Sequence, residues 1–177
     1  FTGLATQAEP QLWGAEQAVW FKQIEADLDN FGAALEWAEA SPETAEVESG
    51  LQLAGSLWQY WITLGCWSEG SDQMERLFAR SDAAQHTPER ALALNLAGIL
   101  AAQSGNMFKA GQYLEQAQSI GNELGDQFKI AHSRYGLGLV AFIEGDLGVA
   151  QEHYEASLSL FRSLEHQAGI TVALKAL

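Results

Sequence analysis

Small and bulky residues recur along this chain at a spacing of 40 residues. The repeat pairs Gly98, Gly105, Ala110 and Leu114 with Gly138, Gly145, Ala150 and Tyr154. A further step back keeps the turn glycine, as Gly65. A fixed period of 20–50 residues is typical of stacked supersecondary units. We therefore expect three units, at 51–90, 91–130 and 131–170, and the beginning of a fourth at 171–177.

Each unit is predicted to be a pair of antiparallel helices. Apolar residues between 90 and 104 recur at helical spacing, and the alternation that marks strands is missing. Gly105-Asn106 is expected to end one helix and cap the next, and Gly145-Asp146 repeats the signal. Ser41-Pro42-Glu43 and Thr87-Pro88-Glu89 are predicted helix starts, with a capping hydroxyl before a proline at the first helical position.

Gly98 and Gly138 lie inside predicted helices, where glycine costs roughly 0.5–1 kcal/mol relative to alanine. We expect them to let a facing helix approach, while Leu114 and Tyr154 fill the space between successive hairpins. The predicted fold is all-α, a right-handed superhelix of stacked helical hairpins. Residues 1–50 are predicted to form an N-terminal helical cap or linker region, and 51–177 to carry the repeats as one continuous domain.

Charge and composition exclude several function classes. Nine Lys and Arg residues against 23 Asp and Glu give a net charge of −14, which disfavours nucleic acid and anionic membranes as direct partners. The single cysteine, Cys66, excludes an internal disulfide and a cysteine-based zinc cage. No run of 18 apolar residues occurs. We expect a piece of a longer cytoplasmic protein, with no metal and no cofactor.

No catalytic constellation is predicted. The sequence lacks Gly-x-Ser-x-Gly, His-Glu-x-x-His and a phosphate-binding Gly-x-x-x-x-Gly-Lys-Ser/Thr loop. Asp27 and Asp29 are two apart on a predicted helix and so point to different sides. We expect a non-enzyme. The alternative is a helical hydrolase or transferase that depends on His132 or His153.

Two sets of residues carry a family resemblance. Leu94-x-x-Ala97-Gly98, with Gly105, Ala110 and Leu114 after it, resembles the tetratricopeptide repeat. The common period of that repeat is 34 residues, so a 40-residue period implies longer helices. Repeats of this length are similar to those of large bacterial ATP-dependent transcription regulators, the MalT-like and LuxR-type proteins.

The segment 24–38, Ile-Glu-Ala-Asp-Leu-Asp-Asn-Phe-Gly-Ala-Ala-Leu-Glu-Trp-Ala, also resembles one that follows the nucleotide-binding and winged-helix modules of those regulators. The segment 53–61 is similar too, but Ser71 and Gln73-Met74-Glu75 depart from the family's Arg and Trp-Leu-Glu. The resemblance implies a sensor or docking arm, with ATPase and DNA-binding modules elsewhere in the parent. The alternatives are a scaffold or adaptor unrelated to transcription and a self-associating element that forms a homodimer.

Two candidate surfaces follow from the repeat register. The first helix of each pair usually lines the inner groove of such a superhelix, which a protein, a peptide or a small inducer could occupy. The predicted groove set is Gln59, Asn95, Gln103, His132, Tyr135, Phe142 and Lys175. It lacks the several Lys and Arg residues that clamp acidic peptide tails. All six tryptophans lie within residues 1–67; either they cap the superhelix, or Trp13, Trp20 and Trp37 dock a neighbouring domain.

Overall fold

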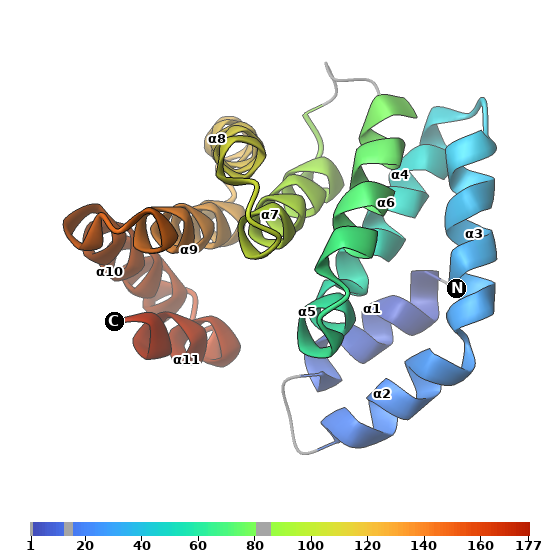
Figure 1. Ribbon diagram of the computed structural model, residues 1–177, viewed down its shortest axis with the longest axis horizontal. Helices are drawn as coiled ribbons and strands as arrows, with labels where there is room; N and C mark the ends of the chain where they lie inside the picture. The colour runs from blue at the N-terminus through green and yellow to red at the C-terminus, as the bar shows by residue number, and fades with distance from the viewer. Residues whose placement is uncertain (1, 13–15, 81–85) are drawn as a thin grey trace. The chain divides into compact units, whose positions relative to one another are not determined.

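The computed structural model describes residues 2–12, 16–80 and 86–177, and its regular structure in these ranges is helical throughout (Figure 1). The all-α prediction is confirmed. The chain divides into two compact units, Phe1–Gln85 (unit 1) and His86–Leu177 (unit 2). The division lies at 85/86 and not at 50/51, so the expected first repeat, 51–90, falls across it.

Unit 1 is built around its fourth helix. Its helices are α1 (Thr2–Gln11), α2 (Gln17–Ala26), α3 (Leu28–Ala40), α4 (Thr44–Ser56), α5 (Trp58–Leu64) and α6 (Trp67–Arg80). α4 packs against α1, α3 and α6, and it buries Val47, Leu51 and Ala54. A Cβ added at Gly50 would lie 2.6 Å from Cβ of Ala38, so this glycine allows α3 and α4 to approach closely.

One predicted helix start in unit 1 is wrong. Ser41 does not cap α4; it ends α3 with an extended ψ of 140°, and α4 begins at Thr44. An extended conformation is what the following proline, Pro42, imposes on the residue before it. The Ser41 hydroxyl accepts a hydrogen bond from the Glu43 backbone N–H at 2.9 Å and donates to the Glu46 carboxylate.

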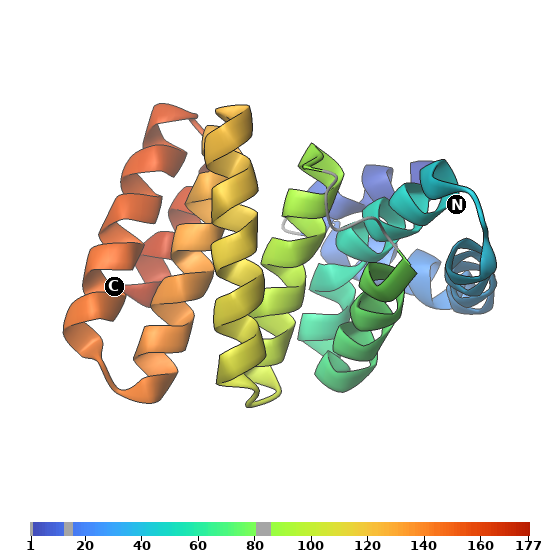
Figure 2. The ribbon, with the colours of Figure 1, turned by 90° about the horizontal axis from the view of Figure 1, so that it is seen from above.

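Unit 2 consists of two complete hairpins and one further helix. The helices are α7 (Pro88–Gln103), α8 (Met107–Leu124), α9 (Gln127–Glu144), α10 (Leu147–Ser163) and α11 (Gln167–Ala176). Each packs on the next in chain order, and α7 also packs on α9. Figure 2 shows the α7–α8 and α9–α10 turns at one end of this unit and the α8–α9 turn at the other. These helices therefore stack as the 40-residue period predicts.

The helix boundaries of unit 2 follow the sequence signals. Oγ1 of Thr87 accepts from the Arg90 N–H at 3.1 Å, with Pro88 as the first helical residue. Gly105 and Gly145 each have φ of 89°, a left-handed conformation that glycine adopts without a steric penalty. The side chains of Asn106 and Asp146 then cap α8 and α10. These predictions are confirmed.

Close helix contacts explain the internal glycines. A Cβ at Gly98 would lie 2.5 Å from Cγ of Leu114, and one at Gly138 would lie 2.7 Å from the Tyr154 ring. Both contacts confirm the predicted approach. Leu114 also occupies the space left by Gly136, where a Cβ would lie 2.3 Å from its Cδ2. Thus one leucine packs between glycines of two successive hairpins. The repeat did not reveal Gly136, because Leu96 stands 40 residues before it.

Candidate interaction surface

The predicted groove set does not gather in one described site. Gln59 belongs to α5 of unit 1, and its side chain lies outside the described residues. The other members lie on α7, α9 and α11 of unit 2, which are the first helices of successive pairs. Phe142 and Lys175 are exposed, while Gln103, His132 and Tyr135 are partly buried. Any groove described by the structure therefore belongs to unit 2.

Asn95 is fully buried, which corrects its assignment to the groove. Its Nδ2 donates to the backbone carbonyl of Lys129 at 3.0 Å, and its Oδ1 accepts from Oγ of Ser133 at 2.7 Å. These hydrogen bonds join α7 to α9 and satisfy a buried amide that would otherwise be costly. The position of Asn95 between Leu94 and Leu96, in a helix with apolar residues on every side, was the sequence signal for burial.

His132 belongs to an aromatic cluster formed by Phe128, His132, Phe161 and His166. Its ring centroid lies 4.5 Å from that of Phe128 and 5.2 Å from that of Phe161. Nε2 of His132 is buried and has no hydrogen-bond partner. Burial, followed by the charges of Lys129 and His166, lowers the pKa of His132 to about 3. The imidazole is therefore neutral near pH 7, and it packs as part of the core.

His166 closes the same cluster from the start of α11. Its Nδ1 accepts from the Gly169 backbone N–H at 3.0 Å, which caps that helix. Burial lowers the pKa of His166 as well. Because the nitrogen that caps the helix must be an acceptor, the neutral imidazole is the form that the fold requires.

Tyr135 lies where α9, α10 and α11 meet. Its ring centroid is 5.7 Å from that of Tyr154, and both rings pack with Ala141, Ala150 and Ala176. Burial raises the pKa of the Tyr135 phenol and, with the nearby Tyr135, raises that of Tyr154 to about 12. Both phenols therefore remain neutral hydrogen-bonding groups at physiological pH.

The histidines proposed for catalysis lack the partners that a general base needs. Nη1 of Arg134 lies 3.4 Å from Nδ1 of His153, and burial followed by this cation lowers the pKa of His153. A carboxylate that orients an imidazole is the usual partner in acid–base catalysis. Among the described residues, no group of three His, Cys, Asp or Glu is placed to hold a metal ion.

The tryptophans of unit 1 divide by burial. Trp58 and Trp61 are core residues, and Nε1 of Trp67 donates to the Ile62 carbonyl at 3.2 Å. Trp37 is 59% exposed and Trp20 is partly buried, so these two remain candidates for docking. Trp13 lies outside the described residues.

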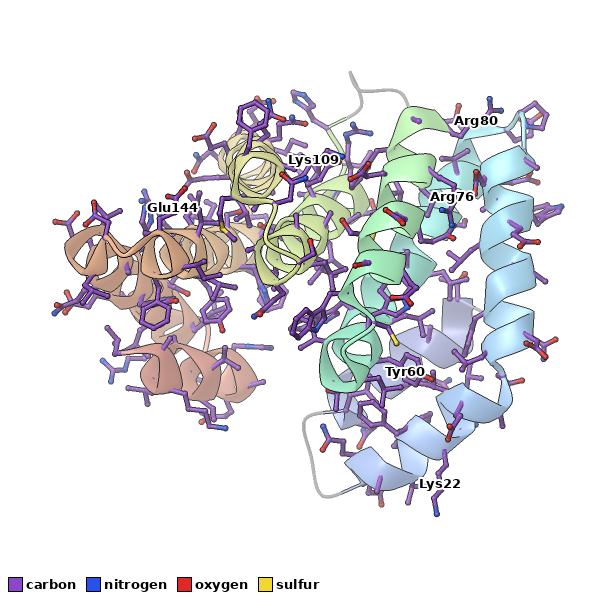
Figure 3. All side chains as sticks on the ribbon, viewed as in Figure 1. Lys22, Tyr60, Arg76, Arg80, Lys109 and Glu144 are labelled. Carbon is purple, nitrogen blue, oxygen red and sulfur yellow. The ribbon has the colours of Figure 1, made fainter. Side chains whose placement is uncertain are left out.

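A shallow depression between α3 and α6 offers no better site. It is lined by Glu36, Glu39, Ala40 and Arg80. Nη2 of Arg80 donates to the Ser41 carbonyl at 3.1 Å, and Nε of the neighbouring Arg76 donates to Glu39 at 3.1 Å; Figure 3 labels both arginines. Their guanidinium groups thus join α6 to α3 and its end.

Comparison with known proteins decides the class of unit 2. The tetratricopeptide-repeat family model matches residues 89–163, which span nearly all of α7–α10. Residues 89–163 are a tetratricopeptide-repeat region. Such repeats commonly mediate protein–protein interaction and are typically non-enzymatic scaffolds. No curated protein matches the chain. Of the helices that the structure describes, none has the length and apolar character to cross a membrane.

Proposed function

We propose that this chain is a non-catalytic interaction or signal-sensing arm of a cytoplasmic bacterial transcription regulator. The tetratricopeptide-repeat region is the observation that carries the interaction role. The resemblance of segment 24–38 to regulators of the MalT-like and LuxR-type supports the parentage, and it implies ATPase and DNA-binding modules in the same protein. A partner that binds one arrangement of those modules more tightly would shift the population of active protein.

The first helices of unit 2 supply the proposed binding surface. Phe142 offers an exposed aromatic ring, Tyr135 a neutral phenol and Lys175 the only cation in the set. This combination suits an extended or helical protein segment, or a small inducer with polar edges. One cation is too few for an acidic peptide tail, whose carboxylates need several charged donors.

The runner-up function is a scaffold or adaptor without a link to transcription. It is favoured by the reach of the family match, which covers the repeats and not segment 24–38. The parent sequence upstream of Phe1 separates the two functions. A phosphate-binding loop followed by a winged helix supports the regulator, and a parent without them supports the adaptor.

Substitutions on the exposed side of α9 and α11 test the groove. We expect Phe142→Ser combined with Lys175→Glu to weaken binding of peptides selected on the wild-type chain by about tenfold or more, because an aromatic anchor and a charge are lost. Peptide display followed by fluorescence polarisation measures this. The matched control is Leu124→Ser with Lys22→Glu, which changes exposed residues elsewhere by the same chemistry. Equal affinity of both double variants would remove the groove assignment.

A further inference from the structure

The turn between α9 and α10 exposes an unusual number of apolar side chains. Ile143 is 44% exposed, Leu147 63% and Val149 40%, and we call these three residues the 143–149 tip. Phe142, one residue earlier, is also exposed but belongs to the groove set above. Scattered single apolar residues are normal on a surface, whereas several on one turn mark an interaction site more often.

The backbone of this turn is held rigidly. The Gly145 N–H donates to the Phe142 carbonyl at 3.1 Å, and the Asp146 N–H donates to the Ala141 carbonyl at 2.9 Å. Oδ1 of Asp146 then accepts from the Val149 N–H at 3.2 Å. This is the Schellman arrangement followed by an N-cap. A partner would therefore meet a preformed surface and lose little free energy in ordering it.

Acidic side chains surround the 143–149 tip. Glu144, Asp146 and Glu152 are exposed, and no Lys or Arg occurs between Arg134 and Arg162. Figure 3 labels Glu144, the last residue of α9, and Lys109, which lies near the start of α8 at the same end of unit 2. Three exposed carboxylates against that one lysine leave this end of the unit negative. Its charge thus complements a cationic partner.

The preceding hairpin shows that the fold does not require these apolar residues. Its turn has the same glycine conformation and the same type of cap. At the positions of Ile143, Leu147 and Val149 it carries Gln103, Met107 and Lys109, of which Met107 packs into the core. The apolar side chains of the 143–149 tip are therefore an addition to the shared hairpin geometry.

We propose that the 143–149 tip docks a basic amphipathic helix of a partner protein. Aliphatic side chains of that helix contact Ile143, Leu147 and Val149, and its Lys or Arg residues pair with Glu144 and Glu152. The contact buries the exposed apolar area and neutralises the surrounding carboxylates. This surface is separate from the groove, so it adds a second binding site to the function proposed above.

A synthetic amphipathic helical peptide of leucine and lysine is the probe, titrated into the chain by calorimetry. We expect Ile143→Gln with Leu147→Gln to weaken binding by about tenfold or more, since two aliphatic contacts are lost. The matched control, Leu124→Gln with Leu164→Gln, removes exposed leucines from the turns after α8 and α10 and should bind like wild type. Circular dichroism verifies that all variants remain folded.

Charge reversal separates docking from general attraction. Glu144→Lys and Glu115→Lys change the net charge equally, and both side chains are exposed. We expect only Glu144→Lys to weaken the peptide, by about fivefold, because Glu115 lies away from the 143–149 tip on α8. Equal weakening by both would mean non-specific attraction and would overturn the proposal.

Three other results would also overturn it. The first is equal binding of a leucine–glutamate peptide. The second is loss of binding only in the groove variant Phe142→Ser with Lys175→Glu, which would support the groove and not the tip. The third is a peptide-free dimer, seen by sedimentation, that Leu147→Gln dissociates; the occupant would then be a second copy of the chain.

Discussion

Gly138→Leu is expected to destabilise unit 2 by about 3 kcal/mol or more. The first added atom, Cβ, would already lie 2.7 Å from the Tyr154 ring, and that ring is buried against Tyr135 and Ala150. Overpacking of a filled core typically costs 1–3 kcal/mol, and here neither helix can move without breaking the hairpin. Urea unfolding followed by circular dichroism measures the loss, and hydrogen exchange in α9 and α10 locates it.

The control is the same substitution at Gly111, in the interior of α8. A Cβ there meets nothing within 4 Å, so Gly111→Leu should stabilise the chain by up to about 0.8 kcal/mol through helix propensity. Tyr154→Ala in the Gly138→Leu background should recover part of the loss, because it removes the clashing ring. An unchanged unfolding midpoint for Gly138→Leu would show that α9 and α10 do not approach as described.

The hairpins of unit 2 were predictable because their signals are local. A glycine at a left-handed position followed by Asn or Asp has one cheap solution, a helix end and a new cap, as at Gly105 and Gly145. The contact between Gly98 and Leu114 was predictable for a related reason, since an otherwise costly glycine inside a helix needs a close neighbour.

The burial of groove positions was not predictable in the same way. Asn95, Tyr135 and Lys175 share one position of the 40-residue repeat. Asn95 is buried, Tyr135 is partly buried and Lys175 is exposed, because fewer described helices pack over each successive one. Exposure thus depends on neighbours in the stack, which the repeat register does not contain. The division at 85/86 depends likewise on long-range packing, by which α4 and α6 join the helices before them.

His132 should make unit 2 less stable as the pH falls below about 6.5. Its pKa is about 3 in the fold against 6.5 for the free side chain, because burial, Lys129 and His166 all disfavour the imidazolium. The unfolded chain therefore binds this proton more readily. The stabilisation that comes from keeping the ring neutral is fully present above the unfolded pKa of 6.5 and is lost as the pH falls toward 3. Between pH 7 and pH 5 the expected loss is about 2 kcal/mol.

His132→Leu isolates this effect, since leucine fills a similar volume among Phe128 and Phe161 and does not titrate. Urea unfolding at pH 7 and pH 5 should show the wild type losing about 2 kcal/mol more than the variant. Carboxylates and the other histidines titrate in both proteins, so their contributions cancel in the difference. Proton NMR of the His132 ring gives an independent measurement, with no titration expected down to pH 5. Parallel losses in the two proteins, or a ring that titrates near 6.5, would mean that water reaches His132 and that the aromatic cluster is not closed around it.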